Sequence, residues 1–407
     1  MKVGVIGGGS VGLSVARDLA LRGFDVVLFE KDGLAAGATG NNHGLLHSGS
    51  RYAVNDPESA RECIRENRVY REIAPNCIKE DGGYFIKFQE DDREYYEKKI
   101  QACRDCGIPV ASLSTDELPQ VLSTEAESGF MVPDAAVDSP RIAAATALDA
   151  ERHGCSIETD SLVVDVETED EEVEALVVDD GSGVRRVGVD HVVNCAGAWV
   201  DQVGELADVQ VPVLPSRGVM VCFDYSLDAV VNRCRPTDDG DILVPHGDLT
   251  VAGTTSEDVS DPEEYPMQDW EVERVTREAV EMVPGLEEAT VVNTYWGVRP
   301  LCVTGSDTDG SGSGDAGSDE PGPREATRGF RIYGSNEYEN GLRGFTSVVG
   351  GKLTTGRLVA EKTVDAVCRE LGVSRSSKTA EEKLPEDDPE VGERMEDWGI
   401  STAKWGR

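Results

Sequence analysis

The fold of this chain is decided by the segment VGVIGGGSVGLSVARDLALRGFDVVLFE, residues 3–30. A short β-branched strand at 3–6 leads into a glycine-rich turn and then into a helix with apolar residues at helical spacing. A second apolar strand at 25–29 ends in an acid, Glu30. Strand, glycine turn, helix, strand and acid in this order predict a dinucleotide-binding βαβ unit.

The glycines and the acid of this unit each have a physical role in binding a dinucleotide. Gly7 permits the tight turn, Gly9 lets the backbone approach a pyrophosphate, and Gly12 lets the helix pack closely on the strands. The helix N-terminus offers free N–H groups and the positive end of its dipole. Glu30 lies where an acid accepts hydrogen bonds from ribose hydroxyls, which favours FAD or NAD over NADP. The alternative is a glycine-rich turn without a ligand.

Composition limits the class of protein. The 407 residues are 39% hydrophobic, which is enough to bury a large core in two lobes or two intertwined domains. The chain has 78 acidic and 39 basic residues and a net charge of -39, which argues against nucleic-acid binding and indicates a halophilic cytoplasm. No apolar run approaches the roughly 20 residues of a membrane-spanning helix, so we expect a cytoplasmic protein.

The cysteines do not have the spacing of a disulfide framework. Ten of them are scattered along the chain, and we expect reduced thiols that are mostly buried. Cys103 and Cys106 make one C-x-x-C pattern on a predicted helix at 95–106. A structural metal site needs a second pair, so we interpret the pattern as a surface coincidence and expect no metal.

A second glycine-rich stretch follows the βαβ unit and has the sequence GATGNNHGLLHSGSRY, residues 37–52. Small residues suit a backbone that passes close to a flat ligand, so we expect this loop beside the isoalloxazine ring of a flavin. His43, His47 and Arg51 come close together in this stretch. The two histidines can also be ordinary loop residues with satisfied ring nitrogens.

The middle of the chain alternates helices and strands. We predict a helix with an alanine-rich face at 139–152, a small antiparallel meander within 156–190 and a buried parallel strand at 191–194. Gly197 follows that strand and would let the backbone approach FAD closely. An ordinary strand-to-helix turn is the alternative at this position.

Extended segments in the second half of the chain predict a sheet that covers the flavin and contains Arg299. Its segments are strands at 213–224, 242–245, 249–254 and 290–298 and a helix at 270–283, capped near Asp269. A low-complexity Gly/Ser/Asp insert at 304–326 is expected to be a surface loop. A strand at 345–349 and a Gly-Gly turn then precede a helix at 354–371, whose N-terminus would point at the flavin. Lys352 adds a positive charge there, or else faces solvent.

Several motifs resemble the large flavoprotein subunit of anaerobic glycerol-3-phosphate dehydrogenase, a family similar in fold to D-amino-acid oxidases. The resemblance is carried by TG at 39–40 through RY at 51–52, NDPESARECIREN at 55–67, VPD at 132–134, VD at 137–138, NRCR at 232–235, DILVP at 241–245, GTT at 253–255, GVRPL at 297–301 and GGKLTT at 350–355. It covers most of the chain, but not the cysteine-rich C-terminal region with which that family usually continues.

The resemblance implies an α/β fold with an α+β substrate lobe, in which a Rossmann-like FAD-binding domain is interleaved with an antiparallel-sheet substrate domain. The expected division is 1–75, 135–205 and 344–373 for the FAD-binding domain, 76–134 and 206–303 for the substrate domain, 304–326 for the insert, 327–343 for a return to the interface of the two domains, and 374–407 for an acidic tail. We expect this tail to be partly ordered, with Trp398 and Trp405 as its anchors.

The resemblance, together with the glycine turn, also implies a set of site residues. FAD binding is assigned to Gly7, Gly9, Gly12, Glu30, Thr39, Gly40, His43, Gly197, Gly351, Lys352, Leu353 and Thr354. Substrate binding is assigned to Arg51, Arg299 and Arg328, since a guanidinium pairs bidentately with phosphate oxygens. Catalytic roles are assigned to His47, Arg299 and Lys352. His47 is our choice of base for the C2 hydroxyl because imidazole titrates near neutrality, and His246 is the second choice.

The leading interpretation is an FAD-dependent enzyme that oxidises sn-glycerol 3-phosphate to dihydroxyacetone phosphate. Its electrons would pass through partner subunits of a membrane-associated complex to a quinone, so the chain would be cytoplasmic or peripheral at the inner face of the cell membrane. Two alternatives stay open. One is an oxidase or dehydrogenase of a 2-hydroxy acid such as L-2-hydroxyglutarate, or of an amino acid. The other is a flavin-bound subunit that has no turnover of its own.

Overall fold

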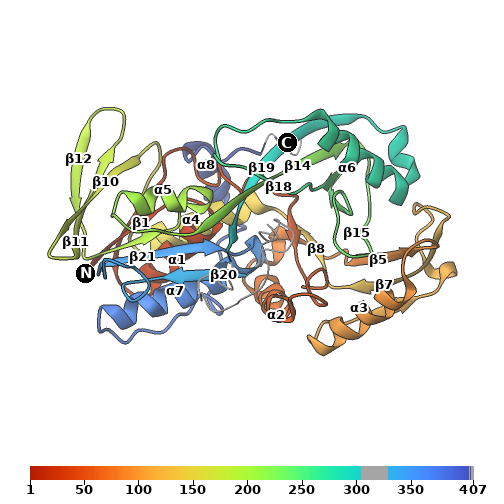
Figure 1. Cartoon of the computed structure of the whole chain (residues 1–407), viewed down its shortest axis with the longest axis horizontal. Helices are drawn as coiled ribbons and strands as arrows, with labels where there is room; N and C mark the ends of the chain where they lie inside the picture. The colour runs from red at the N-terminus through yellow and green to blue at the C-terminus, as the bar shows by residue number, and fades with distance from the viewer. Residues whose placement is uncertain (304–328, 403, 405–407) are drawn as a thin grey trace, which may run out of the picture.

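The computed structural model of the chain describes residues 1–303, 329–402 and 404. Figure 1 shows a mainly parallel sheet in one half of the molecule and a mainly antiparallel sheet in the other. Two long paired strands, β14 (Val213–Phe223) and β19 (Val291–Cys302), run from one half towards the other. The predicted class, α/β with an antiparallel-sheet lobe, is confirmed. The exact domain limits stay predictions.

The first sheet contains the dinucleotide-binding unit. Its strand order is β20-β21-β13-β1-β2-β9, with β20 antiparallel to β21 and the other pairs parallel. The strands are β1 (Lys2–Ile6), β2 (Asp25–Phe29), β9 (Cys155–Glu158), β13 (His191–Asn194), β20 (Phe330–Tyr333) and β21 (Phe345–Gly350). Because β1 and β2 are apolar and central, their carboxyl ends bring Gly7 and Glu30 to one edge of the sheet.

Three helices pack on this sheet and on each other. They are α1 (Ser10–Leu21), α4 (Ser139–Arg152) and α7 (Gly356–Glu370), and α1 contacts both of the others. Their small and β-branched apolar side chains form one core cluster with the strands. The bounds of α4 agree with the sequence prediction because Asp138 caps the helix by accepting a hydrogen bond from the Arg141 amide at 3.1 Å.

The second sheet has the order β18-β14-β17-β16-β15-β5-β7-β6, and β19 also pairs with β14. Apart from the β14–β19 pair, its strands are β5 (Gly83–Phe88), β6 (Ala111–Leu113), β7 (Ala126–Val132), β15 (Val230–Arg233), β16 (Ile242–His246), β17 (Leu249–Gly253) and β18 (Glu257–Asp258). Helix α6 (Asp269–Met282) packs against β14, and the capping residue is Gln268, with no side-chain cap, instead of the expected Asp269.

The remaining elements connect or flank the two large sheets. A meander of β10 (Leu162–Glu169), β11 (Glu172–Asp179) and β12 (Val184–Gly188) confirms the predicted one, and β3 (Leu45–Leu46), β8 (Ala135–Val137) and β4 (Ile78–Lys79) form a small sheet. The other helices are α2 (Pro57–Ile73), α3 (Arg93–Asp105), α5 (Val200–Glu205) and α8 (Pro389–Asp397), with short 3-10 turns η1 (Pro75–Cys77), η2 (Thr115–Glu117), η3 (Gly197–Trp199), η4 (Pro284–Glu287) and η5 (Leu353–Thr355).

The C-terminal segment is more ordered than the sequence led us to expect. Helix α8 packs on α4, and Leu384, Val391, Trp398 and Ile400 belong to the same buried core as the helices of the first sheet. Trp398 is the expected anchor. The segment through residue 402 is nonetheless a packed part of the molecule, because these apolar side chains are spaced to reach one hydrophobic surface. Trp405 lies outside the described residues.

The cysteine prediction is right in kind and wrong in one detail. Throughout the described ranges, every cysteine is a free, buried thiol. Cys103 and Cys106 are buried too, so their pattern is no surface coincidence; it belongs to the core between α3 and the second sheet. Burial raises the pKa of the Cys103 thiol to about 11. Among the residues that the structure describes, no cluster of metal-binding side chains and no helix suited to crossing a bilayer is found.

Candidate active site

A cavity of about 850 Å³ opens at the carboxyl ends of the central parallel strands. Ile6 and Phe29, at the ends of β1 and β2, line one part of it, together with the turn that follows β13. Strand β19 and the turn after β17 line another part through Arg299 and Thr254. The cavity therefore lies where the two large sheets meet, which is the usual ligand position in doubly wound folds.

The glycine turn has the backbone geometry that the sequence predicts. Gly7 has a φ of +108°, which favours glycine, and both Gly7 and Gly9 line the cavity. Gly12 does not line it: a Cβ there would come within 1.9 Å of the Gly7 carbonyl oxygen, so this glycine allows the helix to pack on the turn. Helix α1 has no side-chain cap, and the Ser10 amide donates to Thr39 Oγ1 at 2.8 Å.

Glu30 is held at the end of β2 by two backbone donors. The amides of Gly8 and Asp32 donate to its two carboxylate oxygens at 2.6 and 3.0 Å. Burial raises the pKa of this carboxyl group, and the two amides act in the opposite direction. Because the carboxylate is oriented and also lines the cavity, it suits hydrogen bonding to the hydroxyls of a ribose.

The loop 37–52 brings two histidines and an aromatic ring into the other part of the cavity. The rings of His43 and His47 are 6.0 Å apart, and the ring of Tyr52 is 5.3 Å from that of His47. The backbone of His47 is fixed because its amide donates to Thr354 Oγ1 at 3.0 Å. The Lys352 ammonium lies 4.5 Å from the centre of the Tyr52 ring. A cation and a histidine therefore share this end of the site.

His43 and His246 have environments that differ from that of His47. Burial lowers the pKa of His43 to about 3, and the cations Arg51 and Arg299 act in the same direction. His43 is therefore a neutral ring near neutral pH. His246 does not line the cavity, and its Nε2 donates to the His43 carbonyl oxygen at 2.9 Å. This position favours His47 over His246 as the base.

Two arginines of the described ranges line the cavity, and each is held in a different way. Arg51 donates from one terminal nitrogen to Asp241 Oδ1 at 2.6 Å and from the other to Asn232 Oδ1 at 3.1 Å. Arg299 donates to the carbonyl oxygens of Thr255 and Arg217, at 2.8 and 3.0 Å. Both guanidinium groups remain at the cavity wall. Their spread of donors suits an oxyanion ligand.

The structure brings most of the predicted site residues together, and some of them act differently from expectation. The predicted residues that line the cavity are Gly7, Gly9, Glu30, Thr39, His43, His47, Arg51, Gly197, Arg299, Gly351, Lys352 and Leu353. Gly40 and Thr354 do not line it. A Cβ on Gly40 would meet the Ala35 carbonyl oxygen at 2.4 Å, and Thr354 instead holds His47. Arg328 lies outside the described residues.

Sequence reasoning missed several residues of the site. Tyr52, Thr255 and Trp199 line the cavity. The Lys31 ammonium lies over the Trp199 ring, 4.3 Å from its centre. Asp241 and Asn232, the partners of Arg51, were also missed. The sequence did contain a signal for them, because Asn232 lies in the motif NRCR and Asp241 in the motif DILVP. Those motifs identified a resemblance but did not say which side chain each residue contacts.

The residues of the cavity fit FAD. Gly197 has a φ of +61°, and a Cβ built there would meet no atom within 4 Å, so the cavity wall is open at this backbone position. Gly9 would meet only Thr39 Oγ1, at 3.3 Å. A helix N-terminus whose N-cap residue, Gly9, supplies no side-chain cap and an oriented acid on the next strand complete a site for a pyrophosphate and a ribose. The volume is also in the range of cofactor pockets.

Comparison with known proteins agrees with this site. The profile of the family "FAD dependent oxidoreductase" matches residues 2–357. The chain is 45% identical to the A1 subunit of the anaerobic glycerol-3-phosphate dehydrogenase of Haloferax volcanii, over 97% of this chain and 68% of the relative. It is 38% identical to the A subunit of the anaerobic glycerol-3-phosphate dehydrogenase of Escherichia coli, over 94% of this chain and 69% of that one.

Solved structures show the same fold at lower sequence identity. The dithionite-reduced L-alpha-glycerophosphate oxidase of Mycoplasma pneumoniae, with FAD bound, superposes with a TM-score of 0.74 at 21% identity, covering 94% of this chain and 98% of that one. The glycerol-3-phosphate dehydrogenase of Bacillus halodurans, in complex with FAD, gives 0.68 at 21% identity, covering 94% of this chain and 67% of that one.

Proposed function

Because the chain belongs to the FAD-dependent oxidoreductase family and, within it, to the group of the large subunits of anaerobic glycerol-3-phosphate dehydrogenases, we propose that it oxidises sn-glycerol 3-phosphate to dihydroxyacetone phosphate. One observation carries the proposal: Arg51 and Arg299 line the same cavity as His47, beside a glycine turn that fits a dinucleotide. Bound FAD supplies the acceptor for the hydride that leaves C2 of the substrate.

The two arginines bind the phosphate group of the substrate. A phosphate dianion needs several donors with formal positive charge, and a guanidinium presents its N–H groups in a planar fork that matches two phosphate oxygens. Arg299 reaches the cavity from β19 and Arg51 from the loop before α2, so two separate segments of the chain contact the phosphate.

His47 accepts the proton of the C2 hydroxyl. Its main chain is fixed by Thr354 and its ring lies against Tyr52, so the imidazole has a defined position in the cavity wall. Lys352 adds a positive charge at the same end, which stabilises the negative charge that develops on the C2 oxygen as its proton moves to His47. The apolar lining from Leu353 and Val348 limits water at the reacting carbon.

The electrons leave the chain through partner subunits to a quinone, at the inner face of the cell membrane. The support for this part of the proposal is that the similar proteins of Haloferax volcanii and Escherichia coli are called subunits. A direct check is the reduction of a quinone analogue. The purified chain should reduce it slowly, and added membranes from the native cell should increase the rate. Equal rates with and without membranes would argue against partner subunits.

The substrate role of Arg299 is tested by steady-state kinetics with a dye as electron acceptor. Arg299→Ala removes one guanidinium from the phosphate site, so kcat/KM for glycerol 3-phosphate should fall by about ten- to a hundredfold, in line with a lost hydrogen bond to a charged group. The control is Arg186→Ala, since Arg186 is a surface residue of β12 that pairs with Glu167. If both variants keep the parent kcat/KM, Arg299 is not a substrate ligand.

A further inference from the structure

Helix α6 carries two buried carboxylates that do not line the cavity. Glu271 is 0% exposed and Glu278 is 5% exposed, and they lie seven residues apart, so they occupy the same side of the helix. Burying a carboxylate costs free energy even when it is paired, and such pairs are weak evidence of a contribution to stability. Two buried carboxylates on one helix face therefore suggest a role beyond holding the helix in place.

Glu271 is connected to Arg299 through two residues. One carboxylate oxygen of Glu271 pairs with the Arg217 guanidinium, and the other accepts a hydrogen bond from Thr255 Oγ1 at 2.7 Å. The main-chain carbonyl oxygens of these same two residues accept hydrogen bonds from Arg299, at 3.0 and 2.8 Å. Glu271 thus fixes the side chains of both residues whose backbones hold Arg299 at the cavity wall.

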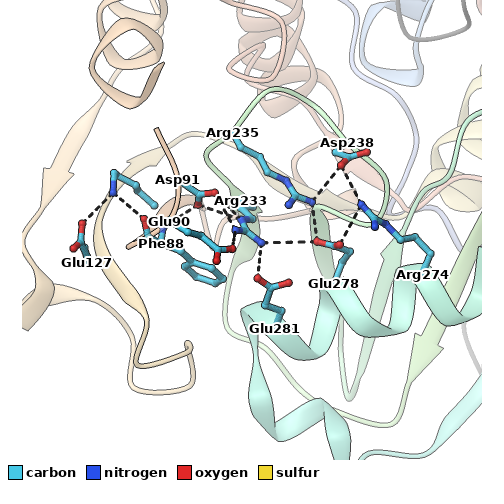
Figure 2. A network of polar contacts seen from close by, with 11 residues as sticks. Phe88, Glu90, Asp91, Glu127, Arg233, Arg235, Asp238, Arg274, Glu278 and Glu281 are labelled. Atoms are coloured by element: carbon cyan, nitrogen blue, oxygen red, sulfur yellow. Dashed lines mark hydrogen bonds and ion pairs between the residues drawn. The ribbon is translucent and has the colours of Figure 1, made fainter. Parts of the chain in front are cut away.

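Glu278 ties the loop that follows β15 to the same helix. Figure 2 shows Arg235 donating to one oxygen of Glu278 at 2.7 Å, while Arg274 lies 3.3 Å from the other oxygen. Arg274 also donates to Asp238 at 3.1 Å. The loop is thereby attached to α6 at two points, Arg235 and Asp238.

The attached loop carries the carboxylate that holds Arg51. Asp241 accepts a hydrogen bond from the Asp238 amide at 3.0 Å with one oxygen, and it receives Arg51 at 2.6 Å with the other. Between them, Gly240 has a φ of +70° and packs so closely on α6 that a Cβ would lie 3.0 Å from the Val275 Cα. The position of Asp241, and with it that of Arg51, depends on the attachment to α6.

We propose that Glu271 and Glu278 are positioning residues for the two arginines of the substrate site, and that α6 sets the spacing of the two guanidinium groups. The inference rests on the proposed function, because it assumes that Arg51 and Arg299 bind the substrate phosphate together. Two guanidinium groups must keep a fixed distance from each other to bind one phosphate group. A single helix that holds the segments supporting both arginines keeps that distance fixed. Neither glutamate touches the substrate.

The same helix offers a matched control. Glu281 also pairs with an arginine, since Arg233 donates to it at 2.7 Å, and Arg233 is bound in turn to Asp91 at 2.9 Å and to Glu90 (Figure 2). None of these four residues lines the cavity. Arg233 also lies 3.9 Å from Glu278, and without Glu281 it keeps that carboxylate, Asp91 and Glu90 as partners. Replacing Glu281 therefore removes an ion pair of α6 but leaves in place the contacts that Glu271 and Glu278 make with Arg217, Thr255, Arg235 and Arg274.

The test uses the FAD-loaded enzyme with Glu271→Gln, Glu278→Gln and Glu281→Gln, because glutamine keeps the size and removes the charge. The first two variants should raise the KM for glycerol 3-phosphate by about tenfold, the effect of one weakened charge-assisted hydrogen bond. Their kcat should stay within about twofold, since phosphate binding is shared by ground state and transition state. The inhibition constant of inorganic phosphate should rise in parallel, and the FAD content should equal that of the parent.

Several results would overturn the inference. It fails if Glu271→Gln and Glu278→Gln keep the parent KM and phosphate inhibition constant, or if Glu281→Gln raises both values as much as they do. If one of the two variants does not fold, the other decides alone by the same two constants. A parent enzyme that binds inorganic phosphate but does not oxidise glycerol 3-phosphate would instead contradict the proposed function, and phosphate binding by the variants would still test the positions of the arginines.

Discussion

At the scale of single residues, the site depends on cations that stay charged inside a strongly acidic chain. Arg51 is only 12% exposed, and burial alone would lower its pKa. Asp241, together with Tyr52 and Asp134, acts in the opposite direction, and the net result is a raised pKa for Arg51. Arg299 is held by carbonyl and hydroxyl oxygens in the described part of the chain. Arg51 is thus held by a carboxylate, and the acceptors of Arg299 include main-chain carbonyl oxygens and a serine hydroxyl.

The burial of His43 predicts how the free energy of unfolding depends on pH. Its pKa is lowered to about 3, below the ordinary value of about 6.5, so the unfolded chain takes up a proton at pH 5 and the folded chain does not. The stabilising contribution of neutral His43 is therefore present above pH 6.5 and is lost as the pH falls from there towards 3. At pH 5 the loss should be about 1–2 kcal/mol of unfolding free energy.

The measurement is urea unfolding of the parent and of His43→Gln at constant high salt between pH 7.5 and about 5, a range set by the ordinary histidine pKa. Glutamine does not titrate, so the variant should lose about 1–2 kcal/mol less than the parent on acidification. The two curves should run parallel above pH 7. Identical losses for both proteins across the range would show that His43 is protonated as easily in the folded state.

Site residues could be predicted from the sequence where the site requires a particular backbone conformation, which only certain residue types adopt easily. Gly7 and Gly9 are needed for a turn that any ligand-bound dinucleotide unit requires, and both line the cavity. The contacts of Thr354 and His246 were not predictable. Each of these contacts depends on which loop lies next to the residue in the folded chain. Thr354 and His47, for example, are 307 positions apart in the sequence. Local patterns contain no information on such pairs.

At the scale of elements, strong periodicity gave reliable predictions and pairing did not. The bounds of α4 and β13 were predicted to the residue because caps and glycines mark their ends. The parallel pairing of β15 with β5 was not predicted, since these strands are separated by well over a hundred residues. The buried charges of α6 were likewise hidden, because a helix with many acids is ordinarily a solvated surface.

The C-terminal element makes a prediction about stability. Trp398 is 4% exposed and joins the core with α4. Its carbonyl oxygen accepts a hydrogen bond from the Leu34 amide at 2.8 Å, so it also supports the loop that follows Glu30. Trp398→Ala should lower the unfolding free energy by about 3 kcal/mol, as for other large aromatic side chains removed from a core. Chemical denaturation at fixed salt measures this change.

Trp270 is the matched control for this substitution. It is 42% exposed at the start of α6, and Trp270→Ala should cost about 1 kcal/mol or less. Comparable losses for the two variants would mean that the segment 374–402 is only loosely attached to the parallel-sheet half. In that case the expectation of a partly ordered tail would hold instead.

At the scale of the whole molecule, the cavity is made where two sheets meet whose strands alternate along the sequence. Strand β19 pairs with β14 and also contacts β21 of the parallel sheet, so Arg299 is brought to the edge where the glycine turn ends. The chain has a net charge of -39. At molar salt the screening length falls to about 3 Å, so repulsion between surface acids is weak while contacts inside the cavity persist.

The resemblance to a known family made this architecture predictable, whereas composition alone allowed only two lobes. The interleaving of the two sheets could not be derived from periodicity, because each chain crossing joins segments that are distant in sequence. The limits of the two domains, and the residues between 304 and 328, are still described by the sequence prediction alone.

The most direct measurement is anaerobic reduction of the bound flavin, because it needs neither an added acceptor nor any partner protein. The FAD-loaded protein in molar salt is mixed with sn-glycerol 3-phosphate while the visible absorbance of the oxidised flavin is recorded. We predict prompt and complete bleaching by glycerol 3-phosphate and none by L-2-hydroxyglutarate. A flavin that stays oxidised with glycerol 3-phosphate but bleaches with the hydroxy acid would contradict the account, and so would a flavin that neither compound reduces.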